Sequence, residues 1–276
     1  MGRTAALTAL AMFAFAANSL LCRAALGARS IDAASFTAVR IVSGAVVLAL
    51  LVRLRSAPAK SARNIPSAAA LFTYAIGFSI AYLKLPAGTG ALVLFGCVQT
   101  TMIIAGIRAG ERPKPAVWVA IVIALAGLVG LTLPGIGAPD PIAAVLMAIA
   151  GIAWGFYSLR GRGAPDPLAV TASNFAWSVP FAAVAFAVAF PFGMHATTRG
   201  VLLASASGAI ASGVGYAIWY TALRGLTATR AAVVQLSVPV IAASGGVLML
   251  GEAVSLRLFV SGVAILGGVA FVVARR

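Results

Sequence analysis

Ten long apolar runs, separated by Pro, Gly or basic residues, constrain this chain more than any other feature of its sequence. A helix that crosses the hydrocarbon core of a bilayer needs about 20 apolar residues, and each run is long enough to cross or nearly cross it. Backbone N–H and C=O groups in lipid must be hydrogen-bonded within the protein, and the alternating pattern of a β-barrel strand is missing, so we expect helices. The runs lie at residues 4–27, 32–52, 66–85, 88–108, 115–134, 141–160, 167–190, 199–223, 229–250 and 255–274. The sequence therefore predicts an all-α membrane protein with ten transmembrane helices.

The composition excludes an ordinary soluble domain. Of the 276 residues, 62% are hydrophobic and 9% are charged, whereas a soluble domain has about 25% charged residues. The net charge of +15 would indicate a nucleic-acid partner in a soluble protein, but here the basic residues lie mainly in the loops. We therefore expect a multi-pass protein of the bacterial inner membrane, with the lipid bilayer as a partner and no nucleic acid.

The distribution of Lys and Arg predicts the orientation in the membrane. If the N-terminus is cytoplasmic, 14 of the 20 basic residues fall in cytoplasmic loops or termini, as the positive-inside rule requires. Both termini should then face the cytoplasm, with basic side chains against anionic lipid headgroups. A lipoprotein signal peptide over the first run is a weaker alternative, because Leu21, which precedes Cys22, is not small.

The two halves of the sequence share a pattern. The tripeptide Ala-Gly-Glu at 109–111 returns as Leu-Gly-Glu 141 residues later, and with a shift of 138 residues Tyr82 matches Tyr220. Each half has five runs, and because five is odd, the second half must enter the membrane from the opposite side. Such inverted repeats are typical of transporters, since they supply the two mirror-image states of alternating access. We expect two five-helix repeats, at residues 1–138 and 139–276.

Several short motifs resemble those of a known family. Pro239 lies in Gln-Leu-Ser-Val-Pro-Val at 235–240, upstream of Leu-Gly-Glu at 250–252 and a Gly-rich last run. Two further motifs are Trp-Gly at 154–155 and the Arg40 of Ala-Val-Arg at 38–40. With these motifs the whole chain resembles the ten-helix EamA-like branch of the drug/metabolite transporter superfamily, and is most similar to bacterial YddG-type exporters of aromatic amino acids. The resemblance implies a central path lined by the first, third, fourth, sixth, eighth and ninth runs. The halves differ where Gln99 stands in place of the Pro239 region.

Polar and aromatic residues in the middle of the runs are the candidate substrate contacts. They are Asn18, Ser79, Tyr82, Gln99, Trp154, Tyr157, Tyr216, Trp219, Tyr220 and Gln235. Aromatic faces can stack on an apolar ring or hold an ammonium group, and amides and hydroxyls can bind a carboxylate. The alternative for about half of the aromatic residues is that they only pack helices or form an interfacial belt.

The acidic residues all lie at predicted helix ends or in loops. They are Asp32, Glu111, Asp140, Asp166 and Glu252. We therefore expect no carboxylate near the bilayer midplane, where a proton relay or a cation pump would keep one. We interpret Glu111 and Glu252 as charges at the N-termini of runs five and ten, where the helix dipole favours them.

Basic residues also lie within the runs or at their ends. Arg40 falls eight residues into the second run, about 12 Å from its outer end at 1.5 Å per residue, and is a candidate for a gating or charge role. Lys84 is a second candidate, although it and Arg23 lie near outer ends, where long side chains reach the interface. The same snorkelling remains an equal alternative for Arg40.

The sequence contains no set of residues typical of an intramembrane enzyme. A nucleophile with a base, paired aspartates and a metal-binding motif are all missing, and His195 lies in a predicted outer loop. Cys22 and Cys97 lack the spacing of metal ligands, so we expect neither an enzyme nor a cofactor or metal.

These features together predict an inner-membrane exporter of small metabolites. Its expected substrates are aromatic or other hydrophobic amino acids, moved by alternating access through a largely uncharged central cavity, with one chain sufficient as a functional monomer. The alternatives are a channel for small solutes and a carrier for other metabolites or drugs.

Overall fold

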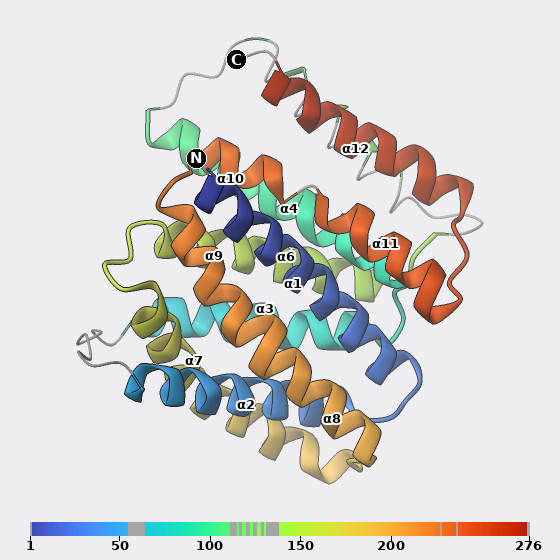
Figure 1. The fold of residues 1–276 in the computed structure, drawn as a ribbon. Helices are drawn as coiled ribbons and strands as arrows, with labels where there is room; N and C mark the ends of the chain where they lie inside the picture. The colour runs from blue at the N-terminus through green and yellow to red at the C-terminus, as the bar shows by residue number, and fades with distance from the viewer. Residues whose placement is uncertain are drawn as a thin grey trace.

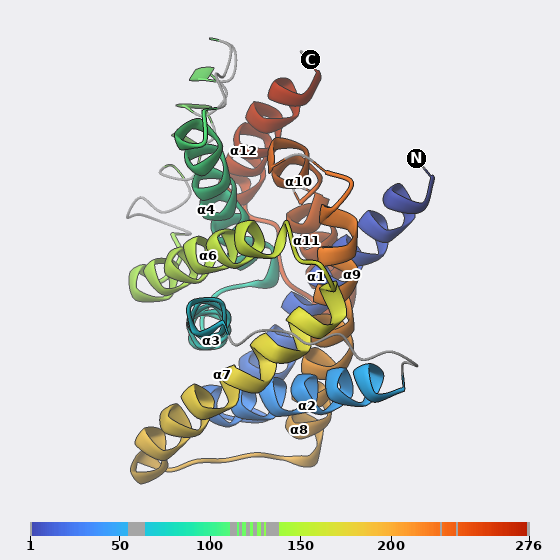
Figure 2. The ribbon, with the colours of Figure 1, turned by 90° about the vertical axis from the view of Figure 1, so that its left-hand side faces the viewer.

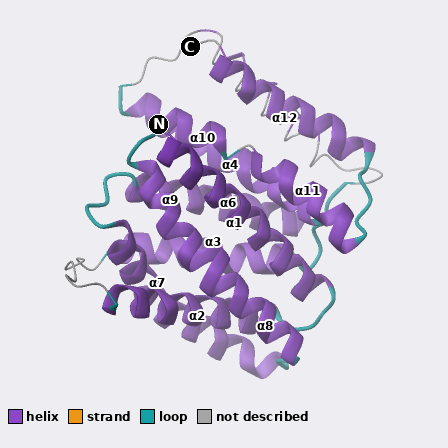
Figure 3. Ribbon diagram, viewed as in Figure 1, coloured by secondary structure: helices purple, strands orange, loops and turns teal. Residues whose placement is uncertain are grey.

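The computed structural model describes residues 2–54, 64–110, 138–226, 228–235 and 237–274, together with single positions between 115 and 130. Within these ranges the regular structure is helical, apart from one isolated β-bridge between Ile31 and Ala196 (Figure 3). Among the described residues, six helices are long and apolar enough to cross a membrane, and two further apolar helices are shorter. The predicted all-α class is confirmed. Most of the fifth run and Glu111 lie outside the described residues, so the number of spans and the inverted repeat stay predictions.

The helices of the first half follow the predicted runs closely. They are α1 (Gly2–Gly27), α2 (Ala33–Arg53), α3 (Ile65–Ala81) and α4 (Ala87–Arg108). The second half begins with α6 (Pro141–Gly161) and α7 (Pro167–Ala189), which continues into the short 3₁₀ helix η1 (Phe190–Phe192). Only the end of α3 differs by several residues, because the chain turns at Tyr82 rather than after Leu85.

Side-chain caps begin most of these helices. Asp32, Asp140 and Asp166 accept hydrogen bonds from backbone N–H groups in the first turns of α2, α6 and α7, and Asn64 does the same for α3. Such caps satisfy donors that the helix itself leaves free. The expectation that these aspartates lie at helix ends is confirmed.

The eighth run is one continuous helical segment with an irregular middle. It consists of α8 (Thr198–Ala206), the π-helix η2 (Ser207–Val214) and α9 (Gly215–Leu223). A π-helix is rare and occurs mostly at functional sites. The glycines on η2 allow a close crossing with α2, since a methyl group on Gly208 would overlap the carbonyl oxygen of Arg40 and the hydroxyl of Ser43.

The ninth run, predicted as a single helix over 229–250, is two helices. The described segments are α10 (Ala228–Val234) and α11 (Ser237–Leu250), followed by α12 (Leu256–Ala274). Pro239 explains the interruption, because in a continuous helix its ring would collide with the carbonyl of Gln235 and it has no N–H to bond there. The structure therefore places Gln235 at a helix break rather than inside a helix.

The helices form three groups in space. Helices α4, α10, α11 and α12 lie at one side of the bundle and α2, α7 and α8 at the other, with α1, α3, α6 and α9 between them (Figure 1). The view from the side shows α3 and α6 facing α1 and α9 across the centre (Figure 2). Helix α1 begins, and α12 ends, at the same end of the bundle (Figure 1). The buried core between the central helices holds the candidate site.

Candidate substrate site

A row of aromatic rings crosses the centre of the bundle. We call it the aromatic ladder, and it consists of Tyr82, Phe78 and Tyr74 from the end of α3, Trp154 and Tyr157 from α6, and Tyr220 from α9. Neighbouring ring centroids are 4.6, 5.2, 5.0, 5.5 and 5.2 Å apart along the row. Each such contact contributes about 0.5–1.5 kcal/mol beyond the area it buries. Because α3 and α9 end at opposite ends of the bundle, the ladder runs along the bundle axis (Figure 1).

Two further rings close the centre of the ladder from the side. Phe15 on α1 lies 5.2 Å from Trp154, and Tyr216 on α9 lies 4.5 Å from it, between ring centroids. Trp154 is 2% exposed and Tyr216 is 1% exposed. The structure is therefore in a closed conformation at this point.

Arg40 lies beside the middle of the ladder and is only 1% exposed. Its Nε donates a hydrogen bond to the Ser212 hydroxyl at 3.0 Å, and its Nη2 donates to the phenol oxygens of Tyr74 at 3.0 Å and Tyr216 at 2.8 Å. The rings of Tyr74 and Phe78 lie 5.0 and 5.1 Å from Arg40 Cζ, within the range of cation–π attraction. Arg40 does not reach solvent, so snorkelling does not describe its position.

The Tyr74 hydroxyl connects Arg40 to Asn18. Asn18 Nδ2 donates to it at 2.9 Å, and the Tyr216 oxygen lies 3.0 Å away. Asn18 Oδ1 accepts hydrogen bonds from Ser207 at 2.6 Å and from Ser212 at 3.3 Å. These serines are five residues apart in η2, and the i to i+5 pattern of a π-helix brings them to the same face. The π-helix therefore supplies two hydroxyls to one amide.

The guanidinium of Arg40 has no counter-charge in the part of the chain that the structure describes. The four described carboxylates lie at helix ends or in loops, and the described ion pairs join Arg23 to Glu252 and Lys84 to Asp140. Arg40 Nη1 has no described hydrogen-bond partner. A buried charge is costly unless it is paired and hydrogen-bonded, so this arrangement favours an anion.

The structure brings most of the predicted contact residues to the centre of the bundle. All ten are buried, none more than 2% exposed: Asn18, Ser79, Tyr82, Gln99, Trp154, Tyr157, Tyr216, Trp219, Tyr220 and Gln235. Their roles as substrate contacts stay predictions, because buried aromatic residues also pack helices. Ser79 bonds to Thr37 on α2 at 2.9 Å, and the Trp219 indole N–H points to Ser158 at 3.4 Å.

The two candidate glutamines have different surroundings. Gln235, at the break between α10 and α11, accepts a hydrogen bond from the Trp154 indole at 3.0 Å. Gln99 on α4 has no partner for either atom of its amide among the described residues. Gln235 is therefore tied to the ladder, while Gln99 is a buried amide with unused donors and an unused acceptor.

The interpretation of Glu252 as an N-terminal charge on the last helix is wrong. Its carboxylate pairs with Arg23 Nε at 2.9 Å and accepts a hydrogen bond at 2.8 Å from the backbone N–H of Ala87, at the start of α4. Arg23 also donates to the Tyr82 carbonyl at 3.1 Å, so it makes specific contacts rather than only reaching the interface. Glu252 directly precedes the last run in the sequence, so α12 was the expected partner of its carboxylate. In the fold, the carboxylate instead contacts Arg23 and the start of α4.

Lys84 lies apart from the Arg40 cluster, which consists of Arg40, Asn18, Tyr74, Ser207, Ser212 and Tyr216. Its ammonium is exposed and contacts Asp140 Oδ2 at 2.7 Å, just before α6. The hydrogen bond from Lys84, together with one from the Ala143 backbone, holds the pKa of Asp140 below its ordinary value. The contact joins the α3–α4 turn to the start of α6, and any role of Lys84 in gating stays a prediction.

Sequence reasoning missed five residues of this site: Phe15, Tyr74, Phe78, Ser207 and Ser212. Tyr74 had a detectable signal, because it precedes Tyr82 by eight residues, or about two helical turns, and so shares its face. The two serines had none, because an α-helix would place residues five apart on different faces.

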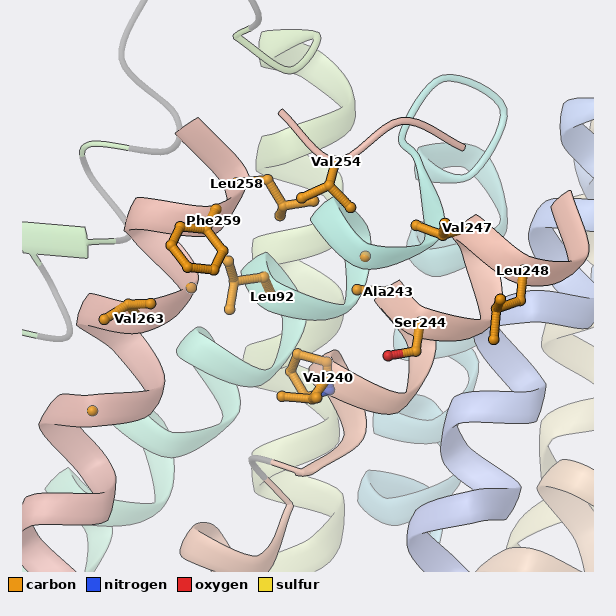
Figure 4. Close-up of a pocket in the computed structure, with 14 residues that line it drawn as sticks. Leu92, Val240, Ala243, Ser244, Val247, Leu248, Val254, Leu258, Phe259 and Val263 are labelled. Atoms are coloured by element: carbon orange, nitrogen blue, oxygen red, sulfur yellow. The ribbon is translucent and has the colours of Figure 1, made fainter. Parts of the chain in front are cut away.

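An apolar pocket of about 740 Å³ lies elsewhere, between α4, α11 and α12 (Figure 4). Leu92, Val240 and Phe259 are among the residues that line it, and Ser244 carries the only side-chain hydroxyl among these lining residues. Large apolar side chains here are exposed, which suits contact with lipid acyl chains. The pocket shares no residue with the Arg40 cluster.

A bundle of long apolar helices around a buried polar and aromatic centre defines a multi-pass membrane protein. Residues 141–274, just under half of the chain, match the model of the EamA-like transporter family, so this part of the chain is similar to that family. The match favours a membrane transporter of small solutes, and it supports the family resemblance that the motifs predicted.

Two comparisons extend over the whole chain. The chain is 53% identical to the uncharacterized protein PA1977 of Pseudomonas aeruginosa. The alignment extends over 275 residues and covers 99% of this chain and 96% of that protein. The chain also resembles a protein of known crystal structure, with a TM-score of 0.71 and 19% sequence identity. The superposition covers 98% of this chain and 99% of the other chain. The second likeness concerns the fold alone.

Proposed function

We propose that this transporter exports small metabolites, with aromatic or other hydrophobic amino acids as substrates, from the cytoplasm across the bacterial inner membrane. It works as a monomer by alternating access, with both termini in the cytoplasm. Helix α1 begins and α12 ends at one end of the bundle, which is consistent with termini on a common side (Figure 1).

The observation that carries this proposal is the aromatic ladder with the Arg40 cluster at its middle. Rings offer stacking surfaces for an aromatic side chain, and the amide, hydroxyl and guanidinium groups beside them offer donors for a carboxylate. Tyr82 and Tyr220, which match in the two halves of the sequence, are the two terminal rings of the ladder. This supports a path related by the predicted two-fold axis.

The closed packing of the rings favours a carrier over a channel. A channel needs a continuous pore in its open state, whereas a carrier passes through states in which the site is shut on one or both sides. Trp154 contacts Phe15, Tyr74 and Tyr216 directly, so a solute passes only if these rings separate.

Flux of radiolabelled phenylalanine into liposomes that contain the purified protein tests this function. We expect saturable uptake that unlabelled phenylalanine on the opposite side accelerates, with alanine a poorer substrate. The proton gradient is imposed or collapsed in parallel to define the energy source. Flux that rises linearly with concentration and shows no counter-transport would favour the channel, and no flux of any amino acid would reject the proposal.

A further inference from the structure

The unpartnered nitrogen of Arg40 points to a ligand. An arginine side chain does not deprotonate in proteins, so the buried guanidinium keeps its charge. Its Nε and Nη2 are used by Ser212, Tyr74 and Tyr216, all of which are neutral, whereas Nη1 is buried and has no described partner. These neighbours thus orient the guanidinium plane and leave the two N–H donors of Nη1 for a further group.

We propose that Arg40 binds the carboxylate of the transported solute through Nη1, an inference that rests on the proposed function of the central site. Carboxylates are the acceptors that match the planar guanidinium best, and charge-assisted hydrogen bonds are about twice as strong as neutral ones. The donors of Asn18 and the Tyr74–Tyr216 hydroxyl pair lie next to the guanidinium. The ladder rings beside them receive the apolar part of the solute.

The charge balance of the site narrows the substrate class to aromatic monocarboxylates. The described part of the site carries one positive charge and no carboxylate, so a monoanion neutralises it. A zwitterion brings an ammonium group as well, which only the ring faces can attract. A cationic solute is repelled by Arg40, and no carboxylate in the described part of the site offsets this repulsion. The expected order of affinity is an aromatic monoanion at or above the zwitterion, and both well above the cation.

A charge series on the unmutated protein tests this order. The probes are 3-phenylpropionate, phenylalanine, phenylalaninamide and phenethylamine, which keep the ring and differ in charge, with acetate as the carboxylate without a ring. Binding to the purified full chain in detergent is measured by calorimetry. We expect the two ring-bearing carboxylates to bind about 10- to 100-fold more tightly than the amide and the amine, which is the value of one charge-assisted hydrogen bond. Acetate should bind more weakly than 3-phenylpropionate.

Variants locate the effect on Arg40. Arg40→Gln should lose the preference for the carboxylate over the amide, and Arg40→Lys should keep part of it. Arg53→Gln, which removes an exposed arginine from the end of the same helix, is the matched control and should keep the full preference. If Arg40→Gln does not fold, the charge series on the unmutated protein still decides the inference.

The outcomes separate this inference from the proposed function. Equal binding of phenylalanine and phenylalaninamide, or no binding of any carboxylate, would overturn the role of Arg40 even if phenylalanine is transported. Carboxylate-dependent binding that Arg40→Gln abolishes, without phenylalanine flux in liposomes, would support Arg40 and reject amino-acid export. Acetate binding as tight as 3-phenylpropionate would show an anion site without the aromatic part, and so overturn the substrate class.

Discussion

Trp154 Nε1 donates a hydrogen bond to Gln235 Oε1 at 3.0 Å, and this bond ties α6 to the break between α10 and α11. Gln235 Nε2 in turn donates to the Ala231 carbonyl at 3.1 Å. Gln235→Leu keeps a similar volume but leaves the buried indole N–H without an acceptor, which costs about 1–3 kcal/mol. We expect a lower midpoint of thermal unfolding and weaker binding of every substrate.

Gln99→Leu is the matched control, because the Gln99 amide is equally buried and has no described partner. Removing a buried amide that makes no hydrogen bond should leave the unfolding midpoint unchanged or raise it. Equal losses in the two leucine variants would show that the Trp154–Gln235 bond adds no stability.

The ladder rings should discriminate between substrates. Trp154→Ala and Tyr82→Ala should weaken the apparent affinity for phenylalanine and tryptophan more than for alanine and threonine, by roughly two- to twelve-fold per ring. Competition for uptake in liposomes measures the ratio. Phe72→Ala is the control, since Phe72 stacks on Phe181 outside the ladder, at 5.8 Å between centroids. If both classes of substrate lose affinity equally in the two ladder variants, the rings only pack helices.

The close crossing of α2 and η2 should not tolerate a side chain. Gly208→Ala places a methyl group against the Arg40 carbonyl and the Ser43 hydroxyl, and such overpacking costs about 1–3 kcal/mol. We expect a clear fall in the thermal unfolding midpoint. Gly163→Ala, between α6 and α7, meets nothing within 4 Å and should leave the midpoint unchanged. A stable Gly208→Ala protein would mean that the helices can move apart.

Glu252 should matter for structure more than for proton coupling. Glu252→Gln keeps an acceptor for the Ala87 N–H but loses the charge that pairs with Arg23. We expect measurable transport with an unchanged dependence on the proton gradient, and the same for Glu111→Gln. Liposome flux with and without a gradient provides the measurement. A folded Glu252→Gln protein without flux would show that this carboxylate is essential to transport.

Cysteine labelling tests the orientation. In a background where Cys22 and Cys97 are replaced by Ala, Ala196→Cys lies in the exposed loop before α8 and Gly163→Cys in the exposed loop between α6 and α7. We expect an impermeant thiol reagent added to whole cells to label the first and not the second. The reverse pattern would place both termini outside.

Much of this architecture could be predicted because the length of each apolar run and the charge of each loop can be read directly from the local sequence. Nine of the runs correspond to described helices, and the ten predicted contact residues are all buried. The break at Gln235 was predictable in principle from Pro239, which cannot continue the preceding helix. The partners of Glu252 and the serines of η2 were not, because they depend on the spatial packing of distant segments and on a rare helical geometry.

The position of two of the four tryptophans makes the conformational cycle observable without a label. Trp154 and Trp219 are buried in the centre, whereas Trp118 and Trp177 are 50% and 37% exposed. Replacing the latter two by Phe would confine the tryptophan fluorescence to Trp154 and Trp219. Since every opening of the path separates rings around Trp154, its emission should shift to longer wavelength and become accessible to aqueous quenchers whenever the protein turns toward one side of the membrane.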